Sequence, residues 1–478
     1  MWKPDLNSKT PLFRQIAIYF EQEITEGKRQ PGSGLPPERK LAQDLGVNRS
    51  TITAAYAELR ATGLVESRQG SGYRVSETLW GVKTKQIPNW KRYAERGVFL
   101  PSAPLQYRIR QAMCQPGMIN LASGEPNPEL YPSKLLADAM SKIPIESSLS
   151  YPEPEGLFAL RKQLSNYLKV NLQISVDEDE ILITAGAQQA LHLITQCLLN
   201  PGDVVGIEGP SYFYSLPLFQ SVGLRILQIP MDKDGLIPSE ILPLYNRHRI
   251  KMVFTNPTLQ NPTGVTLSLD RRHELIETCQ KLGIPIVEDD PYHDFFFDGG
   301  KVLPIKAFDN EHTVLYIGSL SKTVAPGLRI GWIIGPKNIV ERLSDAKQQM
   351  DFGTSTIMQY LAFEYLSSGK REHHLEKVRA ELKYRRDIML RHLKGFSHLV
   401  DYMEPDGSFN IWCRLKKPVP DSDLLEACIQ NGVVIRPGGV FGSEPGCFRL
   451  TYANCTSTMV DQGISRLRQA LDEVITVG

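Results

Sequence analysis

The sequence contains no apolar run of the ~18 or more residues that a membrane-spanning helix needs. Its first residues, Met1-Trp2-Lys3-Pro4-Asp5, lack the apolar core of a secretory signal. The seven cysteines are scattered and form no Cys-x-x-Cys pair, so metal or redox spacing is absent. We therefore expect a cytoplasmic protein with reduced thiols, no bound metal and no membrane contact.

The net charge of +1 predicts no polyanionic partner by itself, but the charge is unevenly distributed. Residues 81–115 carry seven basic residues and one acidic residue, whereas the chain beyond them has a net charge of −7. This basic segment is either a solvated linker or a surface that steers a polyanion. With 41% hydrophobic and 22% charged residues, the 478-residue chain is typical of a globular protein with two to four domains.

Residues 9–77 carry three short helical patterns followed by a hairpin pattern. Apolar residues at 12, 13, 16, 20 and 24 lie on one helical face. Leu35-Pro36-Pro37-Glu38-Arg39 opens a second helix that ends at Gly46, and Asn48 can cap a third. Residues 64–75 fit two short strands around a glycine-containing turn. This order predicts a winged helix-turn-helix.

The third helix of such a fold presents its N-terminal end to base edges, so double-stranded DNA is the expected partner. We expect base contacts from Arg49, Ser50, Thr51 and Thr53, and phosphate or minor-groove contacts from Arg39, Arg68 and Gln69. Through residues 35–39, 41–42, 46–51 and 70–72, the segment resembles the GntR family of bacterial regulators. Residues 78–115, which mix basic and aromatic side chains, are expected to form an interdomain linker with some helix.

Residues 116–475 alternate apolar β-rich stretches with helical periods, which favours an α/β fold with a mainly parallel sheet. Polar residues follow several expected strands, at the carboxyl edge where open α/β sheets bind ligands. They include Gln188 after the stretch 181–184, Asp289 after 286–288, and Ser319 with Lys322 after 314–318. The small-residue turn before Ala187 also predicts an anion site at a helix start.

These residue types meet the requirements of one cofactor. A lysine can form a Schiff base, an aspartate can pair with a protonated pyridine nitrogen, and amides with Ser and Arg can hold a phosphate. The body resembles a fold-type I aminotransferase of class I/II, which implies pyridoxal phosphate (PLP) and a smaller C-terminal subdomain. The whole chain resembles the MocR-type GntR regulators, in which a winged helix is fused to an aminotransferase-like domain.

The resemblance implies a role for each matching residue around the cofactor. Lys322 is implied as the Schiff-base lysine, and Asp289 as the partner of the pyridinium. Tyr292 and Asn261 would hydrogen-bond the phenolic oxygen, and Tyr212 would stack on the ring. The implied phosphate ligands are Ala187, Gln188, Ser319, Ser321 and Arg329.

Three further matches concern the substrate and the subunit arrangement. Arg449 matches an arginine that binds a substrate carboxylate bidentately. Gly124 would approach the substrate. Tyr151 matches a tyrosine that reaches the phosphate of the neighbouring subunit, which implies a homodimer.

Three functions remain open at this point. The first is a dimeric transcription regulator in which PLP and an amino-compound effector change DNA binding. The second is an aminotransferase with an appended DNA-binding module, since the catalytic set is complete. The third is a direct sensor of PLP. The sequence names neither the effector nor the operator.

Overall fold

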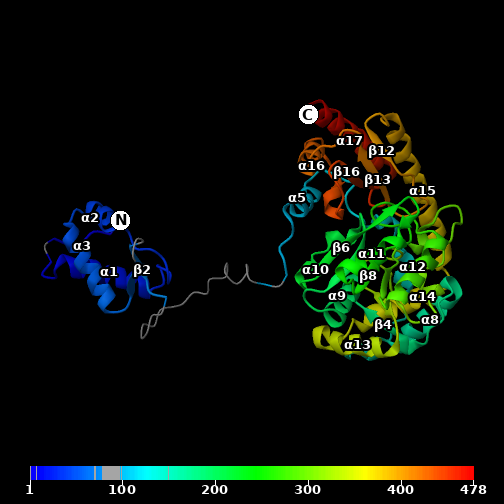
Figure 1. Cartoon of the computed structure of the whole chain (residues 1–478), viewed down its shortest axis with the longest axis horizontal. Coiled ribbons are helices and arrows are strands. Elements are labelled where there is room, and N and C mark those ends of the chain that lie inside the picture. Colours follow the sequence, from blue (N-terminus) through cyan, green and yellow to red (C-terminus); the bar gives the residue numbers. More distant parts are fainter. Residues whose placement is uncertain are drawn as a thin grey trace. The chain divides into compact units, whose positions relative to one another are not determined.

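The computed structural model describes residues 2–6, 8–68, 72–77, 97, 99–148 and 150–477. The chain divides into two compact units, residues 1–97 and 98–478, whose internal structures are visible in Figure 1. Gln69 and residues 78–96 of the expected linker lie outside the described residues.

The N-terminal unit contains three helices and a hairpin, which confirms the expected winged helix-turn-helix. Its elements are α1 (Leu12–Thr25), α2 (Glu38–Leu45), α3 (Arg49–Ala61), β1 (Val65–Arg68) and β2 (Gly72–Val75). Apolar faces of all three helices form one core, in which Phe20 and Tyr56 meet edge to face. Gly46 ends α2 with φ of +67°, a conformation that favours glycine and allows the tight turn into α3. The Asn48 side chain accepts a hydrogen bond from the Ser50 amide and so caps α3.

An eight-stranded sheet forms the centre of the C-terminal unit. Its strands lie in the order β4 (Ile181–Thr184), β11 (Gly331–Ile334), β10 (Val314–Ser319), β9 (Ile286–Asp289), β8 (Met252–Thr255), β5 (Val204–Gly209), β6 (Arg225–Asp232) and β7 (Gly235–Leu236). Strands β10, β9, β8, β5 and β6 are parallel to one another, and β4 runs in the same direction on the far side of β11. Strands β11 and β7 run in the opposite direction and pair antiparallel with their neighbours. The expected mainly parallel α/β sheet is confirmed.

Helices cover both faces of this sheet because alternate strand residues point to opposite sides (Figure 1). In β4, Leu182 packs into the cluster that includes α9 (Ala187–Leu198) and α13 (Lys337–Asp351). Its neighbours Ile181 and Ile183 pack into the cluster on α8 (Phe158–Leu172) and α14 (Thr356–Ser367). Burial on both faces explains why the strands are almost continuously apolar.

A smaller subdomain contains a second sheet in the order β12 (Val400–Tyr402), β13 (Asn410–Leu415), β16 (Cys447–Thr451) and β15 (Arg436–Pro437). Its apolar core includes residues of α15 (Arg371–Gly395), α16 (Asp421–Gln430) and α17 (Ser457–Val477). Before it in the chain, α5 (Pro104–Met113) packs through Ile109 and Ala112 against α16 and β14 (Val433–Val434).

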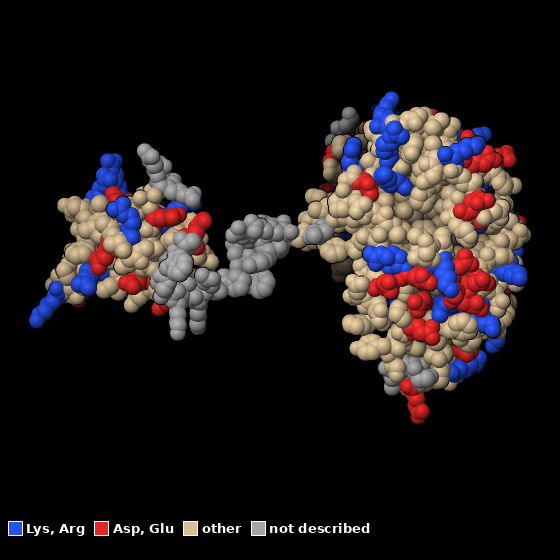
Figure 2. Space-filling model, turned by 60° about the horizontal axis from the view of Figure 1, so that its bottom comes forward, with Lys and Arg blue, Asp and Glu red and all other residues tan. Residues whose placement is uncertain are grey.

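No helix among the described residues is long and apolar enough to span a membrane. On the visible face of the C-terminal unit in Figure 2, Lys and Arg side chains are interspersed with Asp and Glu. That face therefore offers no continuous basic surface for a polyanion.

Candidate cofactor pocket and DNA interface

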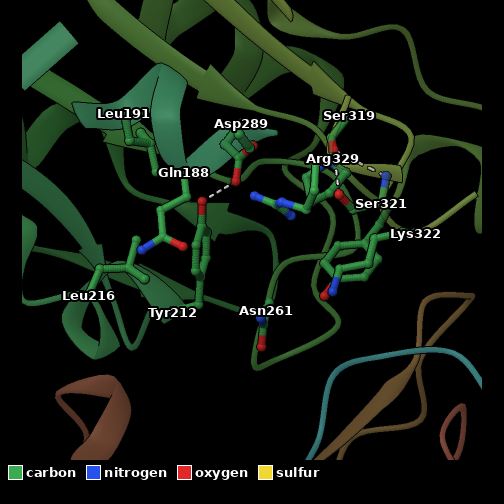
Figure 3. A pocket seen from close by; sticks show the side chains of 13 residues that line it. Gln188, Leu191, Tyr212, Leu216, Asn261, Asp289, Ser319, Ser321, Lys322 and Arg329 are labelled. Carbon is green, nitrogen blue, oxygen red and sulfur yellow. Dashed lines mark hydrogen bonds between the residues drawn. The ribbon is translucent and has the colours of Figure 1, made fainter. Parts of the chain in front are cut away.

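A pocket of about 220 Å³ lies at the carboxyl ends of β9 and β10, beside the start of α9 (Figure 3). It brings together most of the residues that the sequence assigns to the cofactor. Its lining consists of Ala187, Gln188, Leu191, Tyr212, Leu216, Asn261, Asp289, Pro291, Tyr292, Ser319, Ser321, Lys322 and Arg329.

Asp289, the last residue of β9, is only 2% exposed. Its Oδ2 accepts a hydrogen bond from the Tyr212 hydroxyl, as Figure 3 shows, while its buried Oδ1 has no hydrogen-bond partner among the described residues. The Asn256 side chain donates to the Asp289 backbone oxygen at 2.7 Å and fixes the strand end. Burial raises the pKa of the Asp289 carboxyl to about 7. Among the described residues no Lys, Arg or His forms an ion pair with this carboxyl, although the charge of Lys322 lowers its pKa, and a protonated ring nitrogen would supply such a partner.

Lys322 lines the pocket and follows the end of β10. Its Nζ donates a hydrogen bond to the Gly124 carbonyl oxygen at 2.7 Å. Burial lowers the pKa of the Lys322 amine to about 8, so a larger neutral fraction is present near pH 7 than for an ordinary lysine. A neutral amine is the nucleophilic form that attacks an aldehyde.

The start of α9 forms an anion-binding end of the pocket. Gly186 precedes the helix with φ of +82°, and no side chain caps the first turn. Arg329 Nη2 donates to the Ala185 carbonyl oxygen at 2.7 Å, and a Cβ on Gly186 would lie 2.7 Å from that same nitrogen. Ser319 Oγ donates to Ser321 Oγ at 3.0 Å. Backbone amides, two hydroxyls and a guanidinium thus converge where a phosphate would be held.

Arg449, in β16, lies behind the pocket and contacts it through Asn261. Its Nη1 donates to Asn261 Oδ1 at 2.8 Å, and its Nη2 donates to the Ala122 carbonyl oxygen. Burial lowers the pKa of Arg449 to about 9, and burial raises the pKa of Tyr292 to about 12. Gly124 lies beside Arg449, since a Cβ there would be 3.6 Å from its Nη1.

Tyr151 is the one expected cofactor residue that the structure does not bring to the pocket of this chain. Its side chain is 85% exposed and its ring lies 5.8 Å from the ring of Phe352, which is also exposed.

Arg39 and the four expected base-contacting residues lie at the start of α2 and α3, whereas Arg68 is the last residue of β1 and Gln69 lies outside the described residues. Arg39, Arg49, Ser50 and Thr53 are exposed, and Thr51 is half-buried. Glu38 holds the Arg49 guanidinium, which donates from Nε and Nη2 to Glu38 Oε2 at 3.0 Å each.

Comparison with known proteins agrees with this two-part organisation. Residues 116–467 match the aminotransferase class I and II family, and residues 12–75 match the gntR family of bacterial regulatory proteins. YdfD, an uncharacterized HTH-type transcriptional regulator of Bacillus subtilis (strain 168), is 38% identical over 98% of this chain and 97% of its own length. The chain belongs to the MocR-type GntR regulators.

Other proteins similar to this MocR-type chain are aminotransferases. Aromatic-amino-acid aminotransferase 1 of Thermococcus litoralis is 33% identical over 74% of this chain and 88% of its own length. The crystal structure of Pyrococcus horikoshii kynurenine aminotransferase, in complex with PMP, is 32% identical with a TM-score of 0.75. The similarity covers 83% of this chain and 99% of the aminotransferase chain. The fold class is thereby confirmed, and PLP is the cofactor that this family membership supports.

The residues of the MocR-type pocket fit that cofactor. The unpartnered Oδ1 of buried Asp289 suits a ring N–H, the uncapped start of α9 suits a phosphate, and the Lys322 amine suits an aldehyde.

The sequence alone did not identify Asn256, Leu191 and Leu216 as residues in or near the pocket. Asn256 supports both Asp289 and the Asn261 amide, which donates to Asn256 Oδ1 at 2.8 Å. Its position directly after β8, at the same sheet edge, was the available signal.

Proposed function

We propose that the chain is a PLP-dependent, DNA-binding transcription regulator whose aminotransferase-like domain binds an amino-compound effector. The proposal rests mainly on the combination, in one chain, of two features. One is the helix α3 in the position of a recognition helix, and the other is a pocket in which Lys322 lies near buried Asp289, whose Oδ1 has no hydrogen-bond partner among the described residues. Because it binds operator DNA, such a regulator acts in the cytoplasm.

Each pocket residue has a task that its surroundings support. When bound, PLP supplies an aldehyde that reacts with primary amines and a ring that withdraws electrons. Asp289 would keep the ring nitrogen protonated, and the Lys322 amine would hold the aldehyde and release it to an incoming amine. Arg449 would exchange its neutral partners, Asn261 and the Ala122 carbonyl, for the effector carboxylate. The residues that would bind the phosphate are Ala187, Gln188, Ser319, Ser321 and Arg329.

The helix α5 is placed to transmit a change at this site to the chain before it. Gln106 Nε2 donates to the Ser215 carbonyl oxygen at 3.0 Å, three residues after the pocket residue Tyr212. Two residues later, Arg108 binds Glu426 of α16 with two contacts of 2.5 and 2.6 Å. One short helix is therefore tied both to the pocket segment and to the smaller subdomain. A shift of either one on effector binding would displace α5.

A homodimer would complete the site. Tyr151 and Phe352 form an exposed aromatic pair, and large exposed aromatic side chains favour a protein interface. In this arrangement Tyr151 would reach the phosphate bound by the partner subunit.

The second candidate function is an aminotransferase. The joint presence of Lys322, Asp289 and Asn261 in one pocket favours it, because with PLP bound these residues would supply the Schiff-base amine, the partner of the ring nitrogen and a hydrogen bond to the phenolic oxygen. Accumulation of a keto acid at about one turnover per second or faster would support catalysis as the main role. A sensor of PLP itself would instead change operator affinity between the cofactor-free and cofactor-loaded forms, without an amine.

The experiment uses an operator selected by the PLP-loaded full chain from a random DNA pool. Operator affinity is then measured by fluorescence anisotropy against a panel of amino acids and other amines. We expect at least one amine to change the affinity by about 5- to 150-fold. The cofactor-free full chain is the control and should not respond to amines, because it lacks the aldehyde with which an amine reacts. A uniform absence of response across the panel would contradict the proposal.

A further inference from the structure

Arg436 and Arg449 are directly opposed residues on adjacent strands. In the antiparallel pair β15 and β16, Arg436 is the Cα partner of Arg449. Opposed residues of such a pair lie on the same face of the sheet, with Cβ atoms about 4.5–5.5 Å apart. The structure thus places a second guanidinium beside the arginine that is expected to bind the effector carboxylate.

Neither arginine has an acidic partner among the described residues. Arg449 bonds only to neutral oxygens, those of Asn261 and Ala122. The Nε atoms of both Arg436 and Arg449 are buried and have no hydrogen-bond partner. Burial lowers the pKa of both guanidinium groups, and the charge of Arg436 lowers that of Arg449 further.

The lack of an acidic partner is unusual among the buried arginines of the described chain. Arg161, Arg272, Arg385 and Arg386 each have a carboxylate within 4.0 Å, whereas Arg449 has none. Placing like charges together in a low-dielectric environment is unfavourable unless anions neutralise them. One carboxylate on Arg449 would leave Arg436 without a partner.

Further positive charge lies on the same side. The charge of Arg110, on α5, also lowers the pKa of Arg436. The Arg110 side chain donates to Ser102 Oγ at 2.5 Å and has no acidic partner among the described ion pairs. Arg436 itself is half-buried, so part of its side chain is exposed to solvent.

We propose that Arg436 forms a second anionic subsite next to Arg449, so that the effector is an amino compound with two anionic groups, the simplest being a dicarboxylic amino acid. Arg449 binds the carboxylate next to the amine, and Arg436 binds the second anionic group. This inference rests on the proposed function, because it specifies the class of the effector whose carboxylate Arg449 is proposed to bind.

The test compares acids with amides of nearly the same shape. PLP-loaded full chain is titrated with L-aspartate, L-asparagine, L-glutamate and L-glutamine, following the visible absorbance of the bound cofactor and the thermal unfolding midpoint. The wild type should bind the better acid at least about tenfold more tightly than its amide, as expected for one added charge-assisted contact. Arg436→Gln should weaken acid binding about tenfold and change amide binding less than twofold.

Two further variants keep the test interpretable. Arg436→Lys retains the charge and should retain most of the preference for acids, even if Arg436→Gln does not fold. Arg414→Gln, on the neighbouring strand β13, removes an exposed arginine paired with Glu444 and should change nothing.

Different failures are distinguishable. Equal affinity of the wild type for acids and amides, or equal weakening of both by Arg436→Gln, overturns the anionic subsite and leaves the proposed function standing. If neither these four amino acids nor any amine of the panel used in the operator experiment alters the absorbance or the unfolding midpoint, the proposed function itself is overturned.

Discussion

Replacing Asp289 with Asn should stabilise the cofactor-free protein at pH 8, because the variant no longer buries an unpaired charge. Burial raises the pKa of the Asp289 carboxyl to about 7 from an ordinary value of 3.8. The unfolded chain therefore releases this proton near pH 4, whereas the folded chain retains it to near pH 7. Between these values the folded state binds more protons, so the stability of the wild type falls as the pH rises.

The size of the effect follows from the shift. About three pKa units at about 1.36 kcal/mol per unit correspond to a maximum of about 4 kcal/mol. The advantage of Asp289→Asn should approach this maximum at pH 8 and fall to about 1 kcal/mol at pH 4.5. The Tyr212 hydroxyl keeps an acceptor in the variant, because the Asn side chain also carries an oxygen.

The assay is urea denaturation of the cofactor-free full chain at the two pH values, followed by near-UV circular dichroism. Asp309→Asn is the matched control, for which we expect the opposite change in the free energy of unfolding. Asp309 accepts hydrogen bonds from the Thr313 and Val314 amides and from Lys306, and its pKa lies below the usual range. That variant should be destabilised at pH 8. If Asp289→Asn is no more stable than the wild type at pH 8, Asp289 already has a compensating partner, and the reasoning is refuted.

Three other substitutions test separate parts of the account. Lys322→Ala should prevent irreversible attachment of PLP by borohydride; attachment at wild-type yield would contradict the role of Lys322. Arg49→Ala should weaken operator binding by about 1–3 kcal/mol in anisotropy titrations without changing the PLP content, since this guanidinium is exposed and held in place by Glu38; unaltered affinity would sink that assignment. Arg108→Ala should leave operator affinity without effector unchanged but reduce its response to effector, because the tie between α5 and Glu426 is lost; a full response would show that the signal takes another route.

Local sequence rules predicted the N-terminal unit well because its folding signals are local. Asn48 lies directly before α3 and caps it, and Gly46 supplies the left-handed residue that ends α2. The positions of Asp289 and Lys322 were equally predictable from the sequence, since apolar strands followed by polar residues mark the sheet edge.

Contacts between segments far apart in the chain were not accessible in this way. The bond from Tyr212 to Asp289 and the bond from Arg449 to Asn261 depend on how separate loops pack. Arg436 belongs to no motif, and only the strand register shows that it opposes Arg449. Register is set by the packing of the whole subdomain, so the sequence around Arg436 does not reveal it.

In the proposed function, the C-terminal domain senses an amine and thereby controls DNA binding. The most direct measurement is the affinity of an amino acid for the PLP-loaded full chain, read from the cofactor absorbance, with and without saturating operator. Thermodynamic linkage requires operator to change the amino-acid affinity by the same factor by which the amino acid changes operator affinity, about 5- to 150-fold. Equal amino-acid affinities in the presence and absence of operator would contradict the account.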